Sequence, residues 1–154
     1  MRTLLYLTAF LTIIASSCTL SAKQEAHLNK QLSRFVESNN EGIMLEAVAL
    51  SHPAVVRYYK NQNDSVFMEH FKHGLSKNEE AGDFIEDPIF RESKEDQNLI
   101  QRKYELKFYN SDIMLNPKYI IFAVSEDKGE NWFFIRSEDY YNDEIKGFKR
   151  LFKK

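Results

Sequence analysis

One group of side chains with the potential for chemistry is the segment Glu69-His70-Phe71-Lys72-His73. It carries a carboxylate and two imidazoles within one helical turn, and the i, i+3 spacing puts His70 and His73 on one helix face. Two such imidazoles could bind a metal ion together. No third ligand is marked by its spacing, so we favour a solvated polar face beside buried Phe67 and Phe71. We therefore predict no metal and no other cofactor.

The sequence patterns of common catalytic sites are absent from the chain. It contains no G-x-S-x-G, P-loop, H-E-x-x-H or C-x-x-C. The acidic stretch 78–87 lacks the D-x-D-x-D-G arrangement of a calcium loop, and we interpret it as a solvated loop. The net charge of −2 does not suggest binding to nucleic acid. We therefore assign no catalytic residue and favour a protein that is not an enzyme.

Cys18 is the only cysteine of the chain and follows a hydrophobic segment. Arg2, the apolar run from Leu4 to Ala15 and the small residues Ser16 and Ser17 have the layout of a secretory signal peptide. A lone cysteine in an exported protein has no disulfide partner in its own chain. Small residues ending in cysteine resemble the lipobox of bacterial lipoproteins. The resemblance implies that residues 1–17 are removed and that Cys18 is acylated.

The same resemblance implies a lipid anchor in a membrane of the cell envelope. Thr19, where some lipoproteins have aspartate, implies the outer membrane if the cell has two membranes. Ala15 departs from the leucine that is most common at its position. Simple secretion is the alternative, with Ser17 or Ala22 ending the cleavage site, and it places the protein in the periplasm or outside the cell. An uncleaved anchor helix is disfavoured, because spanning a bilayer takes about 20 apolar residues.

Residues 18–154 have the size of a single domain. The chain holds 12 Phe and 8 Tyr but 5 Gly and 3 Pro, a composition typical of an ordered domain. Residues 23–74 predict helices, interrupted at 39–42 and 51–52. The predicted inward-facing residues of the first helix are Leu28, Leu32, Phe35 and Val36, at i, i+4, i+7 and i+8. A later helix is predicted to begin at the N-cap Asp64, to bury Phe67, Met68 and Phe71, and to end at Gly74.

After this region the hydrophobic pattern changes to that of strands. Residues 84–90, around Pro88, predict a short edge strand or a turn. Residues 100–108 alternate between apolar and polar side chains, and 119–124 are continuously apolar, as in a central strand covered on both faces. Residues 132–135 supply the hairpin partner. A last helix is predicted over 138–152, with Tyr141, Ile145, Phe148 and Phe152 buried.

Helices followed by a meander of strands predict the α+β class, with N-terminal helices packed on a curved antiparallel sheet and a C-terminal helix. The order of elements over residues 24–137 resembles the NTF2-like family. Leu50-Ser51-His52-Pro53 through Phe71, followed by strands that end in an aromatic hairpin, carries this likeness. The resemblance implies a cone with a pocket between the helices and the sheet. The final helix departs from the family's usual ending.

The segment Ser125-Glu126-Asp127-Lys128-Gly129-Glu130-Asn131-Trp132 matches S-x-D-x-G-x-x-W and resembles the Asp-box of sialidases. Four of its residues have a structural role: Ser125 and Asp127 accept backbone hydrogen bonds, Gly129 supplies a positive φ, and Trp132 is buried. We predict an antiparallel hairpin of 119–125 and 132–137. A sialidase needs several such boxes in a larger chain. Small secreted ribonucleases need a late histidine, whereas all four histidines here precede residue 74.

Arg102 is in phase with Ile100, Tyr104, Leu106 and Phe108, which places a cation on an apolar sheet face. It should find a carboxylate, reach the rim of the sheet or face a cavity. Extension of its head group to solvent at the strand end is the simpler interpretation. The sharper hypothesis is that Arg102 and Tyr104 line a ligand pocket.

Two functions are compatible with these features. The first is a lipid-anchored, non-catalytic module that binds a small molecule or a partner protein. The second is a small envelope enzyme that uses the cone pocket. A deep pocket with a carboxylate close to a histidine or arginine would favour the enzyme, and a filled cone with exposed apolar residues would favour the binding module.

Overall fold

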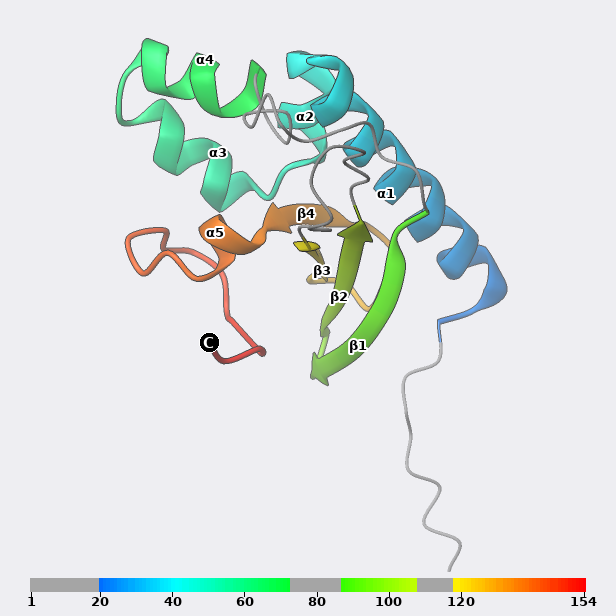
Figure 1. Cartoon of the computed structure of the whole chain (residues 1–154). Helices are drawn as coiled ribbons and strands as arrows, with labels where there is room; N and C mark the ends of the chain where they lie inside the picture. Colours follow the sequence, from blue (N-terminus) through cyan, green and yellow to red (C-terminus); the bar gives the residue numbers. More distant parts are fainter. Residues whose placement is uncertain (1–19, 73–86, 108–117) are drawn as a thin grey trace, which may run out of the picture.

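The computed structural model describes residues 20–72, 87–107 and 118–154. Four helices come first, then four strands, then one short helix (Figure 1). The helices before the sheet are α1 (Ala22–Glu41), α2 (Met44–Leu50), α3 (Pro53–Lys60) and α4 (Asp64–Lys72). The strands are β1 (Ile89–Asp96), β2 (Leu99–Lys107), β3 (Lys118–Ser125) and β4 (Phe133–Arg136), and α5 (Ser137–Tyr140) follows them. The protein is therefore of the α+β class, as predicted.

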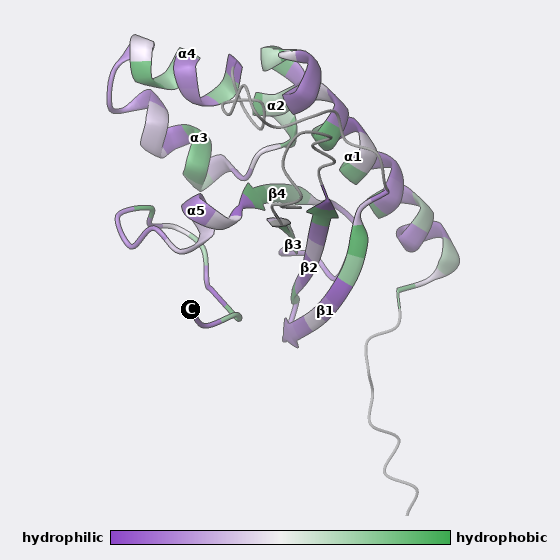
Figure 2. Cartoon of the chain, viewed as in Figure 1, coloured by the Kyte–Doolittle hydropathy of each residue, from purple (hydrophilic) through white to green (hydrophobic). Residues whose placement is uncertain are grey.

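Local sequence signals explain where α1 begins and ends. Ser21 and Gln24 form a capping box, in which each side chain bonds the backbone N–H of the other residue. Gly42 ends the helix in the left-handed conformation, with φ at +71°. Hydrophobic residues recur along α1 between hydrophilic ones (Figure 2). The four residues predicted to face inward, Leu28, Leu32, Phe35 and Val36, are buried.

Helices α3 and α4 begin at polar caps. The Nδ1 atom of His52 accepts a hydrogen bond from the Ala54 N–H at 3.2 Å, and Pro53 occupies the first helical position. The cap of α4 differs from the prediction: the side-chain oxygen of Asn63, rather than Asp64, accepts from the Val66 N–H at 2.9 Å. Phe71 is buried as expected, but Met68 is 42% exposed. The predicted C-cap Gly74 lies outside the described residues.

The four strands form one antiparallel sheet in the order β1-β2-β3-β4. Strand β1 is an edge strand and extends to Asp96, six residues beyond the predicted stretch. Its exposed polar side chains carry little periodic signal. Strands β3 and β4 pair antiparallel, with Phe122 opposite Ile135, which confirms the predicted hairpin.

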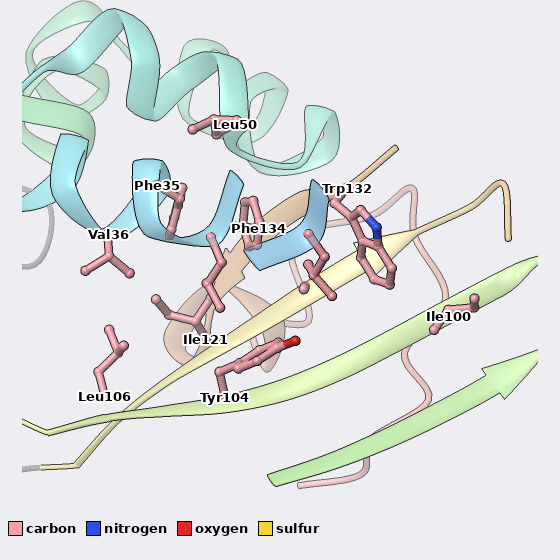
Figure 3. Packing of buried hydrophobic residues seen from close by; sticks show 12 residues of the cluster. Phe35, Val36, Leu50, Ile100, Tyr104, Leu106, Ile121, Trp132 and Phe134 are labelled. Atoms are coloured by element: carbon pink, nitrogen blue, oxygen red, sulfur yellow. The ribbon is translucent and has the colours of Figure 1, made fainter. Parts of the chain in front are cut away.

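Both faces of the sheet are covered. On one face, the apolar side of α1 packs against β2, β3 and β4; Phe35 and Phe134 stack with ring centroids 5.1 Å apart (Figure 3). On the other face, Phe122 and Val124 of β3 pack against residues of α3, α4, α5 and the C-terminal segment. The coverage of β3 on both faces was predicted from its continuous apolar run.

The C-terminal helix is shorter than predicted. Only Ser137–Tyr140 is helical in this part of the chain, and residues 141–152 form turns, bends and irregular chain. The Tyr140 hydroxyl accepts hydrogen bonds from the N–H groups of Leu151 and Phe152, at 2.9 and 3.0 Å, so the segment folds back on itself. Ile145 and Phe152 are buried as expected, but not through helical spacing. No helix within the described ranges is long and apolar enough to cross a membrane.

Candidate functional site

The structure places Arg102 and Tyr104 on the sheet face beneath α1. The Arg102 guanidinium donates to both carboxylate oxygens of Glu25 on α1, each at 2.8 Å, and lies 5.2 Å from the centre of the Phe90 ring. Three outcomes were expected for Arg102: a carboxylate partner, the rim of the sheet or a cavity. The structure shows the first of these, a carboxylate partner. Tyr104 is buried in the α1 core, and burial raises the pKa of its hydroxyl. The two residues thus lie together, and the charge of Arg102 is already paired within the protein.

The turn between β3 and β4 is held by its own side chains. The Ser125 hydroxyl accepts from the Gly129 N–H at 2.8 Å, and Asp127 accepts from the Asn131 N–H at 2.9 Å. Gly129 has φ at +91°. The Trp132 indole is 2% exposed and donates to the Gly129 carbonyl at 3.0 Å. The four residues assigned a structural role therefore surround one turn.

This turn rests on the start of α1. The Gln24 side chain donates to the Lys128 carbonyl and to Glu130, each at 3.0 Å. A Cβ atom on Gly129 would come within 2.7 Å of the Leu20 side chain. The turn and the first helical turn thus form one end of the domain. Cys18 precedes Leu20 by two residues and lies outside the described residues.

A buried cluster of charged and polar side chains connects α3 and α4 to the end of the sheet. His70 of α4 lies with its Nε2 atom 3.2 Å from Oδ2 of Asp139 in α5. The Tyr59 hydroxyl donates to Asp139 Oδ1 at 2.8 Å, and the Tyr59 ring stacks on the His70 ring at 3.5 Å between centroids. The Arg136 Nε atom lies 3.6 Å from Asp139 and 3.3 Å from Glu138, and its guanidinium contacts the His70 ring. This arrangement corrects the interpretation of His70 as part of a solvated face, since its side chain is only 10% exposed.

Burial and charge shift the pKa values in this cluster. Burial lowers the pKa of His70, although the hydrogen bond to Asp139 acts in the opposite direction. Burial alone would raise the pKa of Asp139, but the His70 hydrogen bond and the charges of His70 and Arg136 bring it below its ordinary value. Burial also raises the pKa of Tyr59. At neutral pH the arrangement is a carboxylate held by an arginine, a phenol and an imidazole.

An aspartate, a histidine and a tyrosine in contact are the residue types of general acid–base catalysis. A reacting group would need to reach them, however. The void bordered by His70, Arg136 and Asp139 has no volume for a water molecule, because Phe35, Phe71 and Phe134 fill its other sides. The cluster therefore has the chemical groups of an active site and is closed to a ligand in this structure.

The sequence offered little sign of this cluster. Tyr59, His70, Arg136 and Asp139 come from four elements, and 66 residues separate His70 from Arg136. Only the i, i+3 spacing of Arg136 and Asp139, directly after a strand, could have indicated a local ion pair. His73, which could have bound a metal ion together with His70, lies outside the described residues. Within the described ranges, no group of three or more His, Cys, Asp or Glu side chains could hold a metal ion.

An open groove of about 400 Å³ lies between α3 and the turn at residues 144–147. Its lining comes from two segments that are distant in the sequence. The lining residues are Ala54, Arg57, Tyr58, Asn61, Glu144, Lys146 and Gly147. The Tyr58 hydroxyl donates to the Glu144 carboxylate at 2.6 Å and so joins the two walls. No feature of the sequence had singled out these residues.

Comparison with known proteins gives no relative. No protein-family model matches the chain, and no curated protein or solved structure matches it significantly.

Proposed function

We propose that this protein is a lipid-anchored module of the cell envelope that binds a small ligand or a partner protein without catalysing a reaction. The observation that carries the proposal is the contrast between the closed His70–Asp139 cluster and the open groove beside α3. Groups suited to acid–base chemistry have no space for a substrate, whereas the groove already has the volume of a small-ligand site, for which 300–1,000 Å³ is typical.

Exposed apolar side chains also support a binding role. Leu45 of α2 is 81% exposed and Met68 of α4 is 42% exposed, and the two helices pack against each other. Apolar side chains on two helices in contact could contribute to a surface that binds another molecule.

An anchor on Cys18 would lie close in sequence to the start of the fold. Only three residues separate Cys18 from α1, and an extended chain of three residues spans about 10 Å. An acylated Cys18 would therefore hold the start of α1 and the 126–131 turn close to the bilayer. Two or more acyl chains bind a membrane stably, where one chain does so only marginally.

The anchor is tested by intact-mass measurement of the mature protein and by membrane fractionation. We expect acyl mass on Cys18, and Cys18→Ala should move the protein to the soluble fraction. Sedimentation in the outer-membrane fraction of a diderm cell would agree with the neighbouring Thr19. A mature protein that begins elsewhere and carries no lipid would instead support the secreted or periplasmic alternative.

Binding is tested by screening small fragments against the mature protein in detergent by NMR. We expect fragments to perturb residues of α3 and the 144–147 turn, and not the His70–Asp139 cluster. Perturbations confined to residues around His70 would contradict the choice of site.

The 3.2 Å approach of His70 and Asp139 favours a second candidate, a small envelope enzyme. That function requires His70 to be accessible. Modification by diethyl pyrocarbonate distinguishes the two: His27 is exposed and should react quickly, whereas buried His52 should be protected. The binding module predicts protection of His70 like that of His52. Modification of His70 at the rate of His27 would favour the enzyme.

A further inference from the structure

We infer that the groove beside α3 binds a small anion, a molecule that bears a carboxylate or a phosphate group, through Arg57 and Lys146. The inference rests on the proposed function and names the class of ligand for the same site.

The first wall is one side of α3. Arg57 and Asn61 lie one turn apart, at i, i+4, and therefore project from the same side of the helix. Ala54, one turn before Arg57, is small and buried and leaves room at the base of the groove. The wall thus presents a guanidinium and an amide, both of which donate hydrogen bonds.

The second wall is the turn at 144–147, and Arg150 holds it in place. The Arg150 guanidinium donates to the carbonyls of Asn142 and Ile145, at 2.7 and 2.8 Å, and also to the carbonyl of Tyr140. It also lies over the Phe148 ring, 4.4 Å from its centre. Because these contacts fix the turn before any ligand arrives, binding loses less conformational entropy.

Gly147 completes this wall. Its φ of +105° favours glycine, and a Cβ atom there would lie 3.7 Å from an Nη2 atom of Arg57. The guanidinium of Arg57 therefore reaches across the groove to the opposite wall. Its planar fork of N–H groups suits a carboxylate or a phosphate, which it binds through two parallel hydrogen bonds.

The balance of charge favours an anion. Among the described residues, neither Arg57 nor Lys146 has an ion-pair partner, so both cations remain available to a ligand. Glu144 is the carboxylate of the lining, and it accepts the Tyr58 hydroxyl at 2.6 Å. That hydrogen bond raises the pKa of Tyr58, so the phenol stays protonated and continues to donate to Glu144 at neutral pH. Two free cations against one engaged carboxylate would attract a negatively charged group.

The experiment titrates the mature protein with inorganic phosphate and, separately, with succinate, at constant ionic strength because exposed charges are screened by salt. Binding is followed by NMR at the backbone amides of α3 and the 144–147 turn. We expect at least one of the two anions to bind, and the stronger one identifies the phosphate or the carboxylate as the preferred group. Arg57→Gln should weaken this binding about tenfold through loss of the two parallel hydrogen bonds.

Two further variants test whether Arg57 itself binds the anion, rather than acting through the overall charge of the protein or through loss of the fold. Lys60→Gln removes a cation from the same helix outside the groove, and it should leave the affinity within about twofold of the wild type. Glu144→Gln keeps an acceptor for Tyr58 and removes the opposing charge, so it should tighten anion binding. The inference is overturned if neither anion binds, or if Lys60→Gln weakens binding as much as Arg57→Gln. If neutral fragments still occupy the groove in that case, the binding module stands and only the ligand class is wrong.

Discussion

The imidazole of His70 and the carboxylate of Asp139 lie 3.2 Å apart in the interior, although 69 positions separate them in the chain. Their contact joins α4 to the segment that follows the sheet. Tyr59 and Arg136 complete the pair from α3 and β4, so four elements meet at one carboxylate. We interpret this cluster as a structural connection, because the void beside it has no volume for water.

The first prediction concerns the loss of this carboxylate's charge. Asp139→Asn should lower the free energy of unfolding by about 1–3 kcal/mol, since it removes the charge that His70, Tyr59 and Arg136 contact, while Glu138 remains beside Arg136. Urea denaturation measures the effect. Asp143→Asn, an exposed aspartate four residues later, is the control and should change stability by less than about 0.5 kcal/mol. Equal, small effects of both variants would show that the cluster contributes little to the fold.

The second prediction concerns pH. Burial lowers the pKa of His70 below its ordinary value of 6.5, and it does the same for His52. The unfolded chain therefore takes up protons near pH 6.5 that the folded protein does not, and stability should fall as the pH drops below that value. The lowered pKa of Asp139 adds a further loss as the pH falls below about 4, because protonation then removes its interactions.

Denaturation between pH 5 and pH 8 measures this dependence. His70→Gln should reduce the slope of stability against pH, and His27→Gln, at an exposed position, should leave it unchanged. A slope that is the same in the wild type and in His70→Gln would contradict the assignment to His70.

Sequence periodicity predicted the elements that pack against the core. The apolar faces of α1 and β2 are where expected, because burial imposes a period on each of them. The continuous apolar run of β3 is where expected because both faces of that strand are covered. The second half of β1 was missed, since an edge strand with exposed side chains needs no such period.

The C-terminal segment shows why spacing alone can mislead. Tyr141, Ile145 and Phe148 have helical spacing, yet the chain there forms turns. Gln101 of β2 accepts a hydrogen bond from the Leu151 N–H at 2.9 Å, and Arg150 binds carbonyls of the preceding turn. These tertiary bonds replace the ones a helix would make. The His70–Asp139 cluster and the groove could not be predicted for the same reason, as their residues meet only through the tertiary fold.

The third prediction concerns Trp132. Its indole is 2% exposed in the core beneath α1, so Trp132→Ala should cost about 3–5 kcal/mol of stability. Trp132→Phe keeps most of the apolar volume but loses the hydrogen bond to the Gly129 carbonyl, and it should cost less. Thermal and urea denaturation compare the two variants. A loss below about 1 kcal/mol for Trp132→Ala would contradict the role of this residue as the anchor of the turn.

The fourth prediction tests whether the 126–131 turn is seated on the start of α1. Gly129→Ala should be destabilising for two reasons: its φ of +91° is strained for alanine, and the new Cβ would lie 2.7 Å from the Leu20 side chain. Gly147→Ala is the matched control, since its φ of +105° is also strained but its Cβ would make only ordinary contacts, at 3.6 and 3.7 Å. Leu20 is partly buried against the core beneath α1, so moving its side chain aside would lose contacts, and we therefore expect Gly129→Ala to cost more than Gly147→Ala. In a Leu20→Ala background, Gly129→Ala should cost about as much as Gly147→Ala, because the contact with the Leu20 side chain is gone. A double-mutant cycle measures this coupling. Additive effects of Leu20→Ala and Gly129→Ala would show that the turn does not rest on the residues that follow Cys18.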